Sequence, residues 1–400
     1  MGGGLMQLVA YGAQDIYLTG NPQITFFKIV YRRHTNFSME SIQQTWNGIS
    51  RGANSRCTST ISRNGDLIHK MYLELSGKEN ASNVSVHNPT AHVIDTVEVE
   101  IGGQLIDRHP GKWLEVFAVL TEPNPTGAVG AVENADRGTG TSFQTMSGMG
   151  GFTKSAGGAV ANLKYFVPLR FWFCRNPGNA LPLIALQYHE VKIILNHRML
   201  DIFQSKDTNT LWVDYIYPDT DERRRFAQVS HEYLIEQLQY SNLTISDAAG
   251  KSTTDNLNFN HPVKELVWAN TTGQSVVTGT KGQIPMGHGI KYGLKLNGHD
   301  RFSARDARYF TRQQIHDYHT GYGGLPWGDK KHTDSIAVYS FALKPEEHQP
   351  SGTCNFSRID NAQFVCTGAG GYGNNADTIF AVNYNVLRIM SGMGGLAYSN

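Results

Sequence analysis

The stretch Val93-Ile-Asp-Thr-Val-Glu-Val-Glu-Ile-Gly-Gly103 decides the fold class. Its odd positions are mostly aliphatic, whereas its even positions from Thr96 onward are polar. Because successive side chains of a strand point to opposite faces, this alternation predicts a strand with one buried and one mostly polar face. The pair Gly102-Gly103 supplies the positive φ angles that a tight hairpin turn needs.

Similar signals recur along the whole chain. Further strands are predicted at 24–31, 183–195, 211–217, 336–343, 356–365 and 384–390. Both faces of 24–31 are largely apolar, which predicts a strand buried between two layers. Asn297-Gly298 predicts a second tight hairpin. Only Trp113, Phe117 and Leu120 have helical spacing, so many short strands and few helices predict β-sandwiches or jelly rolls.

A polar run at 218–225 divides the chain into halves of similar length, each long enough for about eight strands. The two halves share one weak similarity: 101–108 and 296–301 each resemble the end of a strand followed by a tight turn and polar residues. This similarity alone does not establish that one half is a duplicate of the other. The glycine-rich segment 122–163 is expected to be a long irregular surface loop.

The composition excludes several classes of protein. The chain has 400 residues, of which 42 are glycine and 17% are charged, and its formal net charge is +1. A near-neutral chain without a basic tail is not attracted to nucleic acid or to an acidic membrane. No apolar stretch is long enough for a membrane span, and the first residues make a poor signal peptide. The four scattered cysteines are expected to be buried thiols.

Motifs for catalysis, cofactors and metals fail on spacing or context. Gly368–Gly373 matches a dinucleotide fingerprint, but no helix signal follows it. His189-Glu190 and His231-Glu232 lack the second histidine of a zinc protease, and no nucleophile elbow occurs. The pair His316 and His319 is interpreted as satisfied or solvated histidines, and Glu98 with Glu100 as part of a solvated sheet face. The sequence therefore predicts no enzyme, cofactor or metal.

Other features point to contacts with proteins or sugars. Arginine and aromatic residues are interleaved over 301–309, which suits protein–protein contacts. Asn80 and Asn83 lie in glycosylation sequons within a polar run and are the expected glycosylation sites. A β-sandwich lectin using the aromatic loop 321–327 is an alternative interpretation. A β-sandwich hydrolase is a further one, disfavoured because no nucleophile or acid/base pair is found.

The opening of the chain carries a specific resemblance. The run Met6-Gln-Leu-Val-Ala-Tyr-Gly-Ala-Gln-Asp-Ile-Tyr-Leu-Thr-Gly-Asn-Pro-Gln-Ile-Thr-Phe-Phe-Lys28 closely resembles the start of major capsid proteins of nucleocytoplasmic large DNA viruses, especially algal viruses such as the chlorella viruses. Further resembling blocks follow in collinear order at 31–37, 61–67, 181–192, 212–216, 226–228, 231–237, 258–262, 351–361 and 383–398. The presumed loops at 77–90, 122–163, 271–286 and 313–333 do not match.

The resemblance implies an all-β double jelly roll, which is two tandem eight-stranded antiparallel sandwiches with few short helices and long loops. It places an N-terminal arm at 1–23, the first jelly roll at 24–217, a linker at 218–227 and the second jelly roll at 228–400. Three chains would form a homotrimer with a nearly hexagonal outline, the capsomer of an icosahedral virion.

The resemblance also implies partners and a location. The capsomers would contact one another and minor capsid or cement proteins, over an internal membrane in which they are not inserted and without direct contact to nucleic acid. Assembly would occur in the host cytoplasm, and outward loops would carry sugars. The arm has apolar residues without a core of their own, and we expect it to pack along the base of the tile as an assembly segment through Leu5, Met6, Leu8 and Val9.

Overall fold

The computed structural model describes residues 3–10, 12–77, 88–134, 137–154, 163–201, 203, 208–244, 251–269, 286, 289–324, 334–368 and 376–398. They form two compact units, Met1–Asn36 and Phe37–Asn400, which are described separately below.

The first unit contains two short helices, α1 (Gly3–Val9) and α2 (Ile16–Thr19), and otherwise turns and extended chain. The predicted buried strand at 24–31 is wrong. Six large apolar side chains of this stretch are between 72% and 98% exposed: Ile24, Phe26, Phe27, Ile29, Val30 and Tyr31. An apolar pattern on both faces is typical of a buried strand, but a strand also needs a neighbouring strand to hydrogen-bond with. The first strand in the described residues begins only at Phe37.

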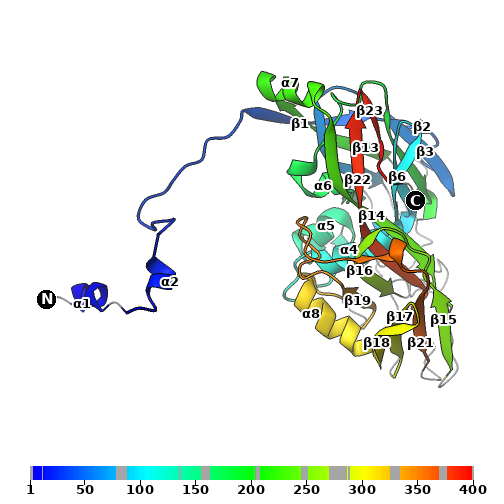
Figure 1. Ribbon diagram of the computed structural model, residues 1–400. Coiled ribbons are helices and arrows are strands. Elements are labelled where there is room, and N and C mark those ends of the chain that lie inside the picture. Colours follow the sequence, from blue (N-terminus) through cyan, green and yellow to red (C-terminus); the bar gives the residue numbers. More distant parts are fainter. Residues whose placement is uncertain are drawn as a thin grey trace. The chain divides into compact units, whose positions relative to one another are not determined.

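The first half of the second unit is a sandwich of two antiparallel sheets (Figure 1). Sheet A has the order β1 (Phe37–Gln44), β13 (Thr208–Pro218), β4 (Leu67–Gly77) and β10 (Leu163–Pro168), with the short β11 (Leu181–Pro182) beside β4. Sheet B has the order β2 (Asn47–Gly48), β3 (Ser55–Thr60), β12 (Val191–His197), β5 (Ile94–Ile101) and β6 (Gln104–Pro110).

The second half is built in the same way. Sheet C has the order β14 (His231–Asn242), β22 (Thr378–Met390), β16 (Pro262–Ala269) and β19 (Ile336–Ser340), with β20 (Cys354–Asn355) beside β16 and β23 (Met393–Leu396) beside β22. Sheet D has the order β15 (Ser252–Asn256), β21 (Ala362–Thr367), β17 (Lys291–Leu296) and β18 (His299–Asp306).

Both halves have jelly-roll topology. When the short strands β2, β11, β20 and β23 and a small separate sheet are set aside, eight described strands remain in each half. Numbered along the chain within their half, they are ordered 1-8-3-6 in one sheet and 2-7-4-5 in the other, and this order is identical in the two halves. The chain is therefore a double jelly roll, as predicted.

Two predicted hairpins occupy the same place in this topology. Gly102 and Gly103 (φ 60° and 84°) connect β5 to β6, and Asn297 and Gly298 (φ 51° and 82°) connect β17 to β18. Positive φ at both central residues is the turn geometry that matches the twist of paired strands. Each hairpin joins the fourth and fifth strands of its half, so the weakly similar segments 101–108 and 296–301 lie at structurally equivalent positions.

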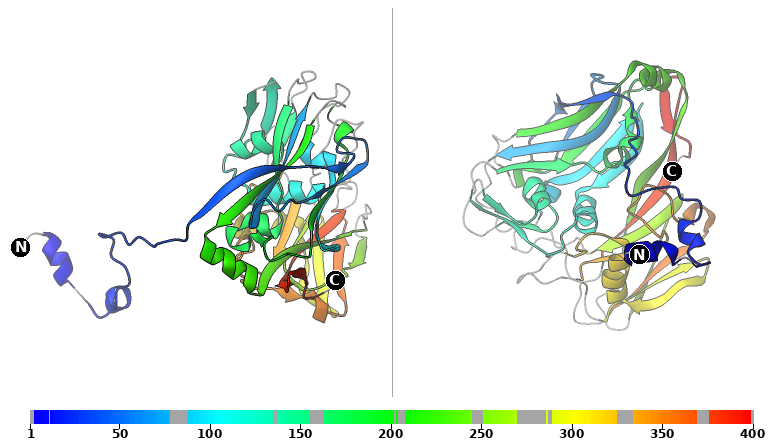
Figure 2. Two further views of the ribbon diagram at one scale, coloured as in Figure 1. Left: turned by 90° about the horizontal axis from the view of Figure 1, so that it is seen from above. Right: turned by 90° about the vertical axis from the view of Figure 1, so that its left-hand side faces the viewer.

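Each sandwich encloses its own hydrophobic core. The second core is centred on Trp268, whose ring lies 5.1–5.3 Å from those of Tyr292, Phe310 and Phe364. The first core contains residues of sheets A and B, and in addition Ile235, Leu387 and Ile389 from the second half. The red C-terminal strand accordingly rises into the upper sandwich in Figure 1 and in the right-hand view of Figure 2. The four cysteines are free thiols; Cys57, Cys174 and Cys366 are buried, as expected, whereas Cys354 is partly exposed.

The helices confirm one prediction and correct others. The helix with Trp113, Phe117 and Leu120 is confirmed as α4 (Gly111–Thr121). The segment 122–163 is not a plain loop, since it forms β7 (Gly130–Asn134), β8 (Arg137–Thr139) and β9 (Phe152–Lys154) in the small sheet, and α5 (Ser142–Ser147). A capping box between Thr141 and Gln144 starts α5.

The predicted linker 218–227 is largely helical. Helix α7 (Thr220–Gln228) begins after the N-cap Asp219 and carries Asp221 and Glu222 in its first turn, where acidic groups favour a helix. Three predicted strands are shorter than expected. Residues 183–190 precede β12 as turns and bends, β19 ends at Ser340 and is followed by bends at 341–343, and Phe356–Arg358 is the 3-10 helix η4.

The remaining helical elements are short: α3 (Pro89–Val93), α6 (Trp172–Arg175), η1 (Pro177–Asn179), η2 (Met199–Asp201), η3 (Tyr309–Gln313) and α8 (Gln314–Tyr318). None of the helices in the described ranges is long and apolar enough to cross a membrane.

Candidate functional site: the junction between the two halves

Helix α4 forms the apolar centre of the junction. Leu114 and Ala118 point into the first core, while Trp113, Val116, Val119 and Leu120 pack against sheet C of the second half. The ring of Trp113 lies 5.2 Å from that of Phe380 on β22. One helix therefore contributes to the packing of both sandwiches, and burial of its large side chains opposes their separation.

Hydrogen bonds to backbone carbonyls connect the end of α4 to the chain beyond α8. The amide of Gly321 donates to the Leu120 carbonyl at 2.7 Å, and the Thr320 hydroxyl donates to the Thr121 carbonyl at 3.1 Å. A Cβ at Gly321 would lie 2.2 Å from the Val119 carbonyl oxygen. Only glycine allows the two segments to approach this closely.

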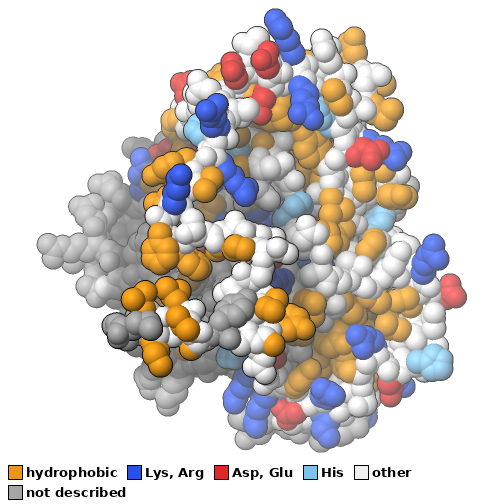
Figure 3. All heavy atoms as spheres, turned by 60° about the vertical axis from the view of Figure 1, so that its left-hand side comes forward, with side chains coloured by type: hydrophobic (Ala, Val, Ile, Leu, Met, Phe, Trp, Pro, Cys, Tyr) orange, Lys and Arg blue, Asp and Glu red, His pale blue; other side chains and the backbone are white. Residues whose placement is uncertain are grey.

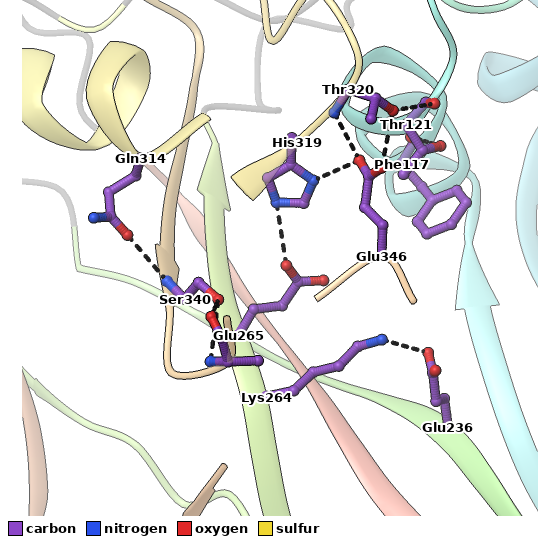
Figure 4. A network of polar contacts seen from close by, with 11 residues as sticks. Phe117, Thr121, Glu236, Lys264, Glu265, Gln314, His319, Thr320, Ser340 and Glu346 are labelled. Carbon is purple, nitrogen blue, oxygen red and sulfur yellow. Dashed lines mark hydrogen bonds and ion pairs between the residues drawn. The ribbon is translucent and has the colours of Figure 1, made fainter. Parts of the chain in front are cut away.

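His319 lies between two carboxylates beside these bonds (Figure 4). Its Nε2 is 3.2 Å from Glu265 of β16, and its Nδ1 is 3.1 Å from Glu346. Burial alone would lower the pKa of His319, but hydrogen bonds and charges from Glu265 and Glu346 more than offset it and raise the pKa to about 9. The pKa of Glu346 is lowered, because its hydrogen bonds to His319 and Thr320 outweigh burial.

A second ionic group joins α6 of the first half to sheet C. Glu236 of β14 accepts a hydrogen bond from Lys264 of β16 at 2.7 Å and pairs with Arg175 of α6 at 2.8 Å. His348 lies 3.7 Å from Glu236 and is also hydrogen-bonded to Asn179 of η1. Burial would raise the pKa of Glu236, but the charges of Arg175 and Lys264 hold it well below its usual range.

The C-terminal hairpin makes a third connection between the halves. The Tyr188 amide donates to the Gly392 carbonyl at 3.0 Å, and the Leu396 amide donates to Gln104 of β6 at 3.3 Å. His189 lies 3.0 Å from the Gly394 carbonyl. A Cβ at Gly394 would be 2.6 Å from Cδ2 of Leu186, so β23 packs closely against the first sandwich.

The chemistry of the junction is structural. Its buried charges are matched by opposite charges, and no described group of three or more His, Cys, Asp or Glu side chains is arranged to hold a metal ion. His319 is a satisfied histidine and His316 is exposed, as interpreted from the sequence. The predicted solvated Glu98 instead pairs with Arg108 at 2.9 Å.

The residues predicted from the sequence as sites lie elsewhere. Leu5, Met6, Leu8 and Val9 of α1 are 56–78% exposed. Figure 3, in which the left-hand side of Figure 1 comes forward, shows apolar side chains exposed on this face of the molecule. Asn80 and Asn83 lie outside the described residues, as do 325–327 of the candidate lectin loop and 369–373 of the glycine motif.

Sequence reasoning missed the junction residues Glu236, Lys264, Glu265 and Glu346. They come from separate strands and turns, and isolated charged residues have no spacing that predicts which of them will meet. The one available signal was the burial of charges within β16, where Lys264 and Glu265 interrupt an apolar strand between Val263 and Leu266.

The double jelly roll is the fold of viral major capsid proteins, as solved structures of such proteins match this chain over nearly its whole length. The chain belongs to the family of major capsid proteins of large eukaryotic DNA viruses. A model of the major capsid protein N-terminus matches residues 25–219, and a model of the large eukaryotic DNA virus major capsid protein matches 222–395.

Individual relatives cover the whole chain. The major capsid proteins of Pyramimonas orientalis virus and Paramecium bursaria Chlorella virus 1 are 50% and 41% identical to it, with complete coverage of both chains in each comparison. The crystal structure of VP54 of PBCV-1 has a TM-score of 0.78 at 36% identity and covers 94% of this chain and 100% of that one. The Faustovirus major capsid protein shares the fold with a TM-score of 0.69 at 12% identity, covering 95% and 94%.

The predicted resemblance to algal-virus capsid proteins is thus confirmed. The chain is therefore a capsid protein and a component of the virion.

Proposed function

We propose that this chain is a non-catalytic tile of an icosahedral shell, and that three copies close into a capsomer with a nearly hexagonal outline. The observation that supports this most directly is the identical strand order of the two halves. Three chains with two similar sandwiches each present six similar units around a ring. Head-to-tail contacts in such a ring close without a free end.

The junction supports a mechanical role within this proposal. A tile keeps its outline only if its two sandwiches do not rotate against each other. Helix α4, the two ionic groups and the C-terminal hairpin each connect the halves at a different place. We propose that the jelly-roll domains comprise the strands from Phe37 to Pro218 and from His231 to Met390, connected through α7.

The charge of the chain fits the proposed surroundings. A net charge of +1 avoids long-range repulsion among many identical copies, so that short-range contacts decide assembly. It also suits a shell that lies over an internal membrane without inserting into it and does not touch nucleic acid. Within this proposal, assembly takes place in the host cytoplasm, minor capsid proteins bind between tiles, and Asn80 and Asn83 carry sugars.

The oligomeric mass tests the proposal. Size-exclusion chromatography with light scattering on the full chain is expected to give the mass of three chains, about three times 44.3 kDa. A stable single chain at micromolar concentration would contradict the capsomer proposal. Lectin activity is tested on the same sample with a glycan array, on which a shell tile is expected to show no binding.

A further inference from the structure

The contact between α4 and sheet C provides a template for a contact between copies. Helix α4 follows the fifth strand of the first half, β6. It covers the face of sheet C that points away from the second core, where Val267, Val338 and Phe380 are completely buried. Sheet C is therefore covered on both faces, although in a sandwich only one face of a sheet is covered by the partner sheet.

Sheet A occupies the equivalent place in the first half. On sheet C, Val267 of β16 is the register partner of Phe380 on β22 and Val338 on β19. On sheet A, Tyr72 of β4 is likewise the register partner of Trp212 on β13 and Pro168 on β10. Unlike their counterparts, these three residues remain partly exposed.

The outer face of sheet A has the composition of a protein interface. The Tyr72 ring stacks on Trp212 with centroids 6.3 Å apart and meets Phe166 edge-on at 6.0 Å. A pocket of about 410 Å³ adjoins these rings and is lined by Tyr72, Phe166 and Asp214 of the sheet and by Phe143 and Met146 of α5. Partly exposed aromatic residues beside a pocket are typical anchor points of protein–protein contacts.

The charges on this face are few and balanced. Glu74 pairs with Lys164 at 2.6 Å and accepts a hydrogen bond from the Trp212 indole at 2.7 Å, which fixes the aromatic cluster in place. Lys70 and Asp214 are the other charged groups that line the pocket beside the rings, together with Arg170, which pairs with Glu122. The face therefore favours a partner that offers aromatic groups and planar cations rather than a strongly charged one.

The segment after β18 in the second half occupies the same topological place as α4. It consists of η3 and α8, and Phe310 and Ile315 hold it against its own half. Its other side exposes Gln313 and His316. Arg305 lies above the Tyr309 ring at 4.7 Å, so an arginine and a tyrosine are presented together. Both residue types pack well on aromatic surfaces.

We infer that the outer face of sheet A binds the η3–α8 segment of a second copy of this chain, and that this contact repeats between copies the one that α4 makes with sheet C within a chain. The contact joins two different surfaces, so it propagates head-to-tail and closes as a ring. This inference rests on the proposed capsomer and names the surfaces that would form it.

Two kinds of variant separate the two surfaces. Asp214→Lys and, independently, Trp212→Lys change the sheet face. The double variant Gln313→Glu/His316→Glu changes the helical face by placing two negative charges opposite Glu74 and Asp214. Each kind of variant alone is expected to lose the three-chain mass in light scattering and to elute as a single chain, because every contact in the ring uses both surfaces.

Mixing the variants gives the decisive result. A sheet-face variant retains a native helical face and the helical-face variant retains a native sheet face, so one native contact remains possible. The mixture is expected to form a complex of two chains that grows no further. A mixture that stays at the mass of one chain would overturn the inference, and so would a face variant that keeps the three-chain mass.

Matched controls make a failure interpretable. Thr58→Lys places a lysine on the partly exposed outer side of sheet B and is expected to leave the three-chain mass unchanged. A thermal unfolding transition like that of the wild type shows that a variant chain is folded. If Trp212→Lys does not fold, Asp214→Lys tests the sheet face in its place. If the wild type has the mass of three chains and the face variants keep that mass, only this inference is overturned. If the wild type has the mass of one chain, the proposed capsomer is overturned as well.

Discussion

Lys264 and Glu236 form an ion pair with Nζ and Oε2 2.7 Å apart, and their side chains are only 1% and 3% exposed. Arg175 reaches the same carboxylate from the other half of the molecule at 2.8 Å. Glu236 therefore compensates two cations that come from different sandwiches. Because an unpaired buried charge is costly, this carboxylate couples the position of α6 to that of sheet C.

Glu236→Gln is expected to lower the free energy of unfolding by about 3–5 kcal/mol, because it leaves the buried Lys264 ammonium without its partner. Urea unfolding followed by tryptophan fluorescence measures this change. The double variant Glu236→Gln/Lys264→Met is expected to recover part of the loss. Glu347→Gln is the matched control, since Lys344 and Glu347 pair at the exposed surface, and a much smaller loss is expected there. Equal losses for the two glutamines would contradict the assignment.

The pH dependence of stability is expected to report on His319. Its pKa is raised to about 9 in the folded chain, above the ordinary value near 6.5, so its contribution is complete below about pH 6.5 and is lost as the pH rises through 9. The free energy of unfolding that protonated His319 contributes is at most about 3 kcal/mol. Melting temperatures of wild type and His319→Gln are expected to converge between pH 7 and pH 9.5. A difference that stays constant over this range would show that His319 is not protonated in the folded chain.

The lowered pKa of Glu346 predicts the opposite trend in acid. A carboxylate with a lowered pKa stabilises the fold above its ordinary value near 4.5, and this contribution is lost as the pH falls below it. Glu346→Gln is therefore expected to reduce stability at pH 7 and to differ less from wild type near pH 3. The same melting experiment measures this, with Glu347→Gln as the exposed control.

Gly321→Ala is expected to destabilise the chain by about 1–3 kcal/mol, because the added methyl group would meet the Val119 carbonyl at 2.2 Å. Urea unfolding measures the loss. Gly178→Ala is the control, since a Cβ there meets only a side-chain oxygen of Asn176 at 3.5 Å, and it should be close to neutral. If both substitutions are tolerated equally, the close approach of the two segments does not constrain residue 321.

Deleting residues 1–20 is expected to weaken capsomer assembly while leaving the jelly rolls folded. Leu5, Met6, Leu8 and Val9 are exposed in the single chain and are not part of any of its described cores. Light scattering measures the three-chain fraction, and thermal unfolding measures the fold. A wild-type yield of trimer from the shortened chain would refute an assembly role for this segment.

The sequence by itself determined the fold class and much of the local structure. Alternation from Val93 to Ile101 and the pairs Gly102-Gly103 and Asn297-Gly298 specify strands and turns through interactions between near neighbours, and both hairpins form as predicted. Local patterns also misled where a strand needed a distant partner, as at 24–31. The capping box at Thr141 and the N-cap at Asp219 are local signals of the same kind, and each starts a helix.

Only the tertiary structure decided how the two halves are joined. Glu236, Lys264, His319 and Glu346 are distant in sequence, and they meet because β14, β16 and the turns beyond α8 and β19 converge beside α4 and α6. The partly exposed rings of Tyr72 and Trp212 likewise resemble ordinary strand residues until the register of sheet A places them together. Periodicity reports which way a side chain points, whereas the group that it meets depends on the packing of whole sheets.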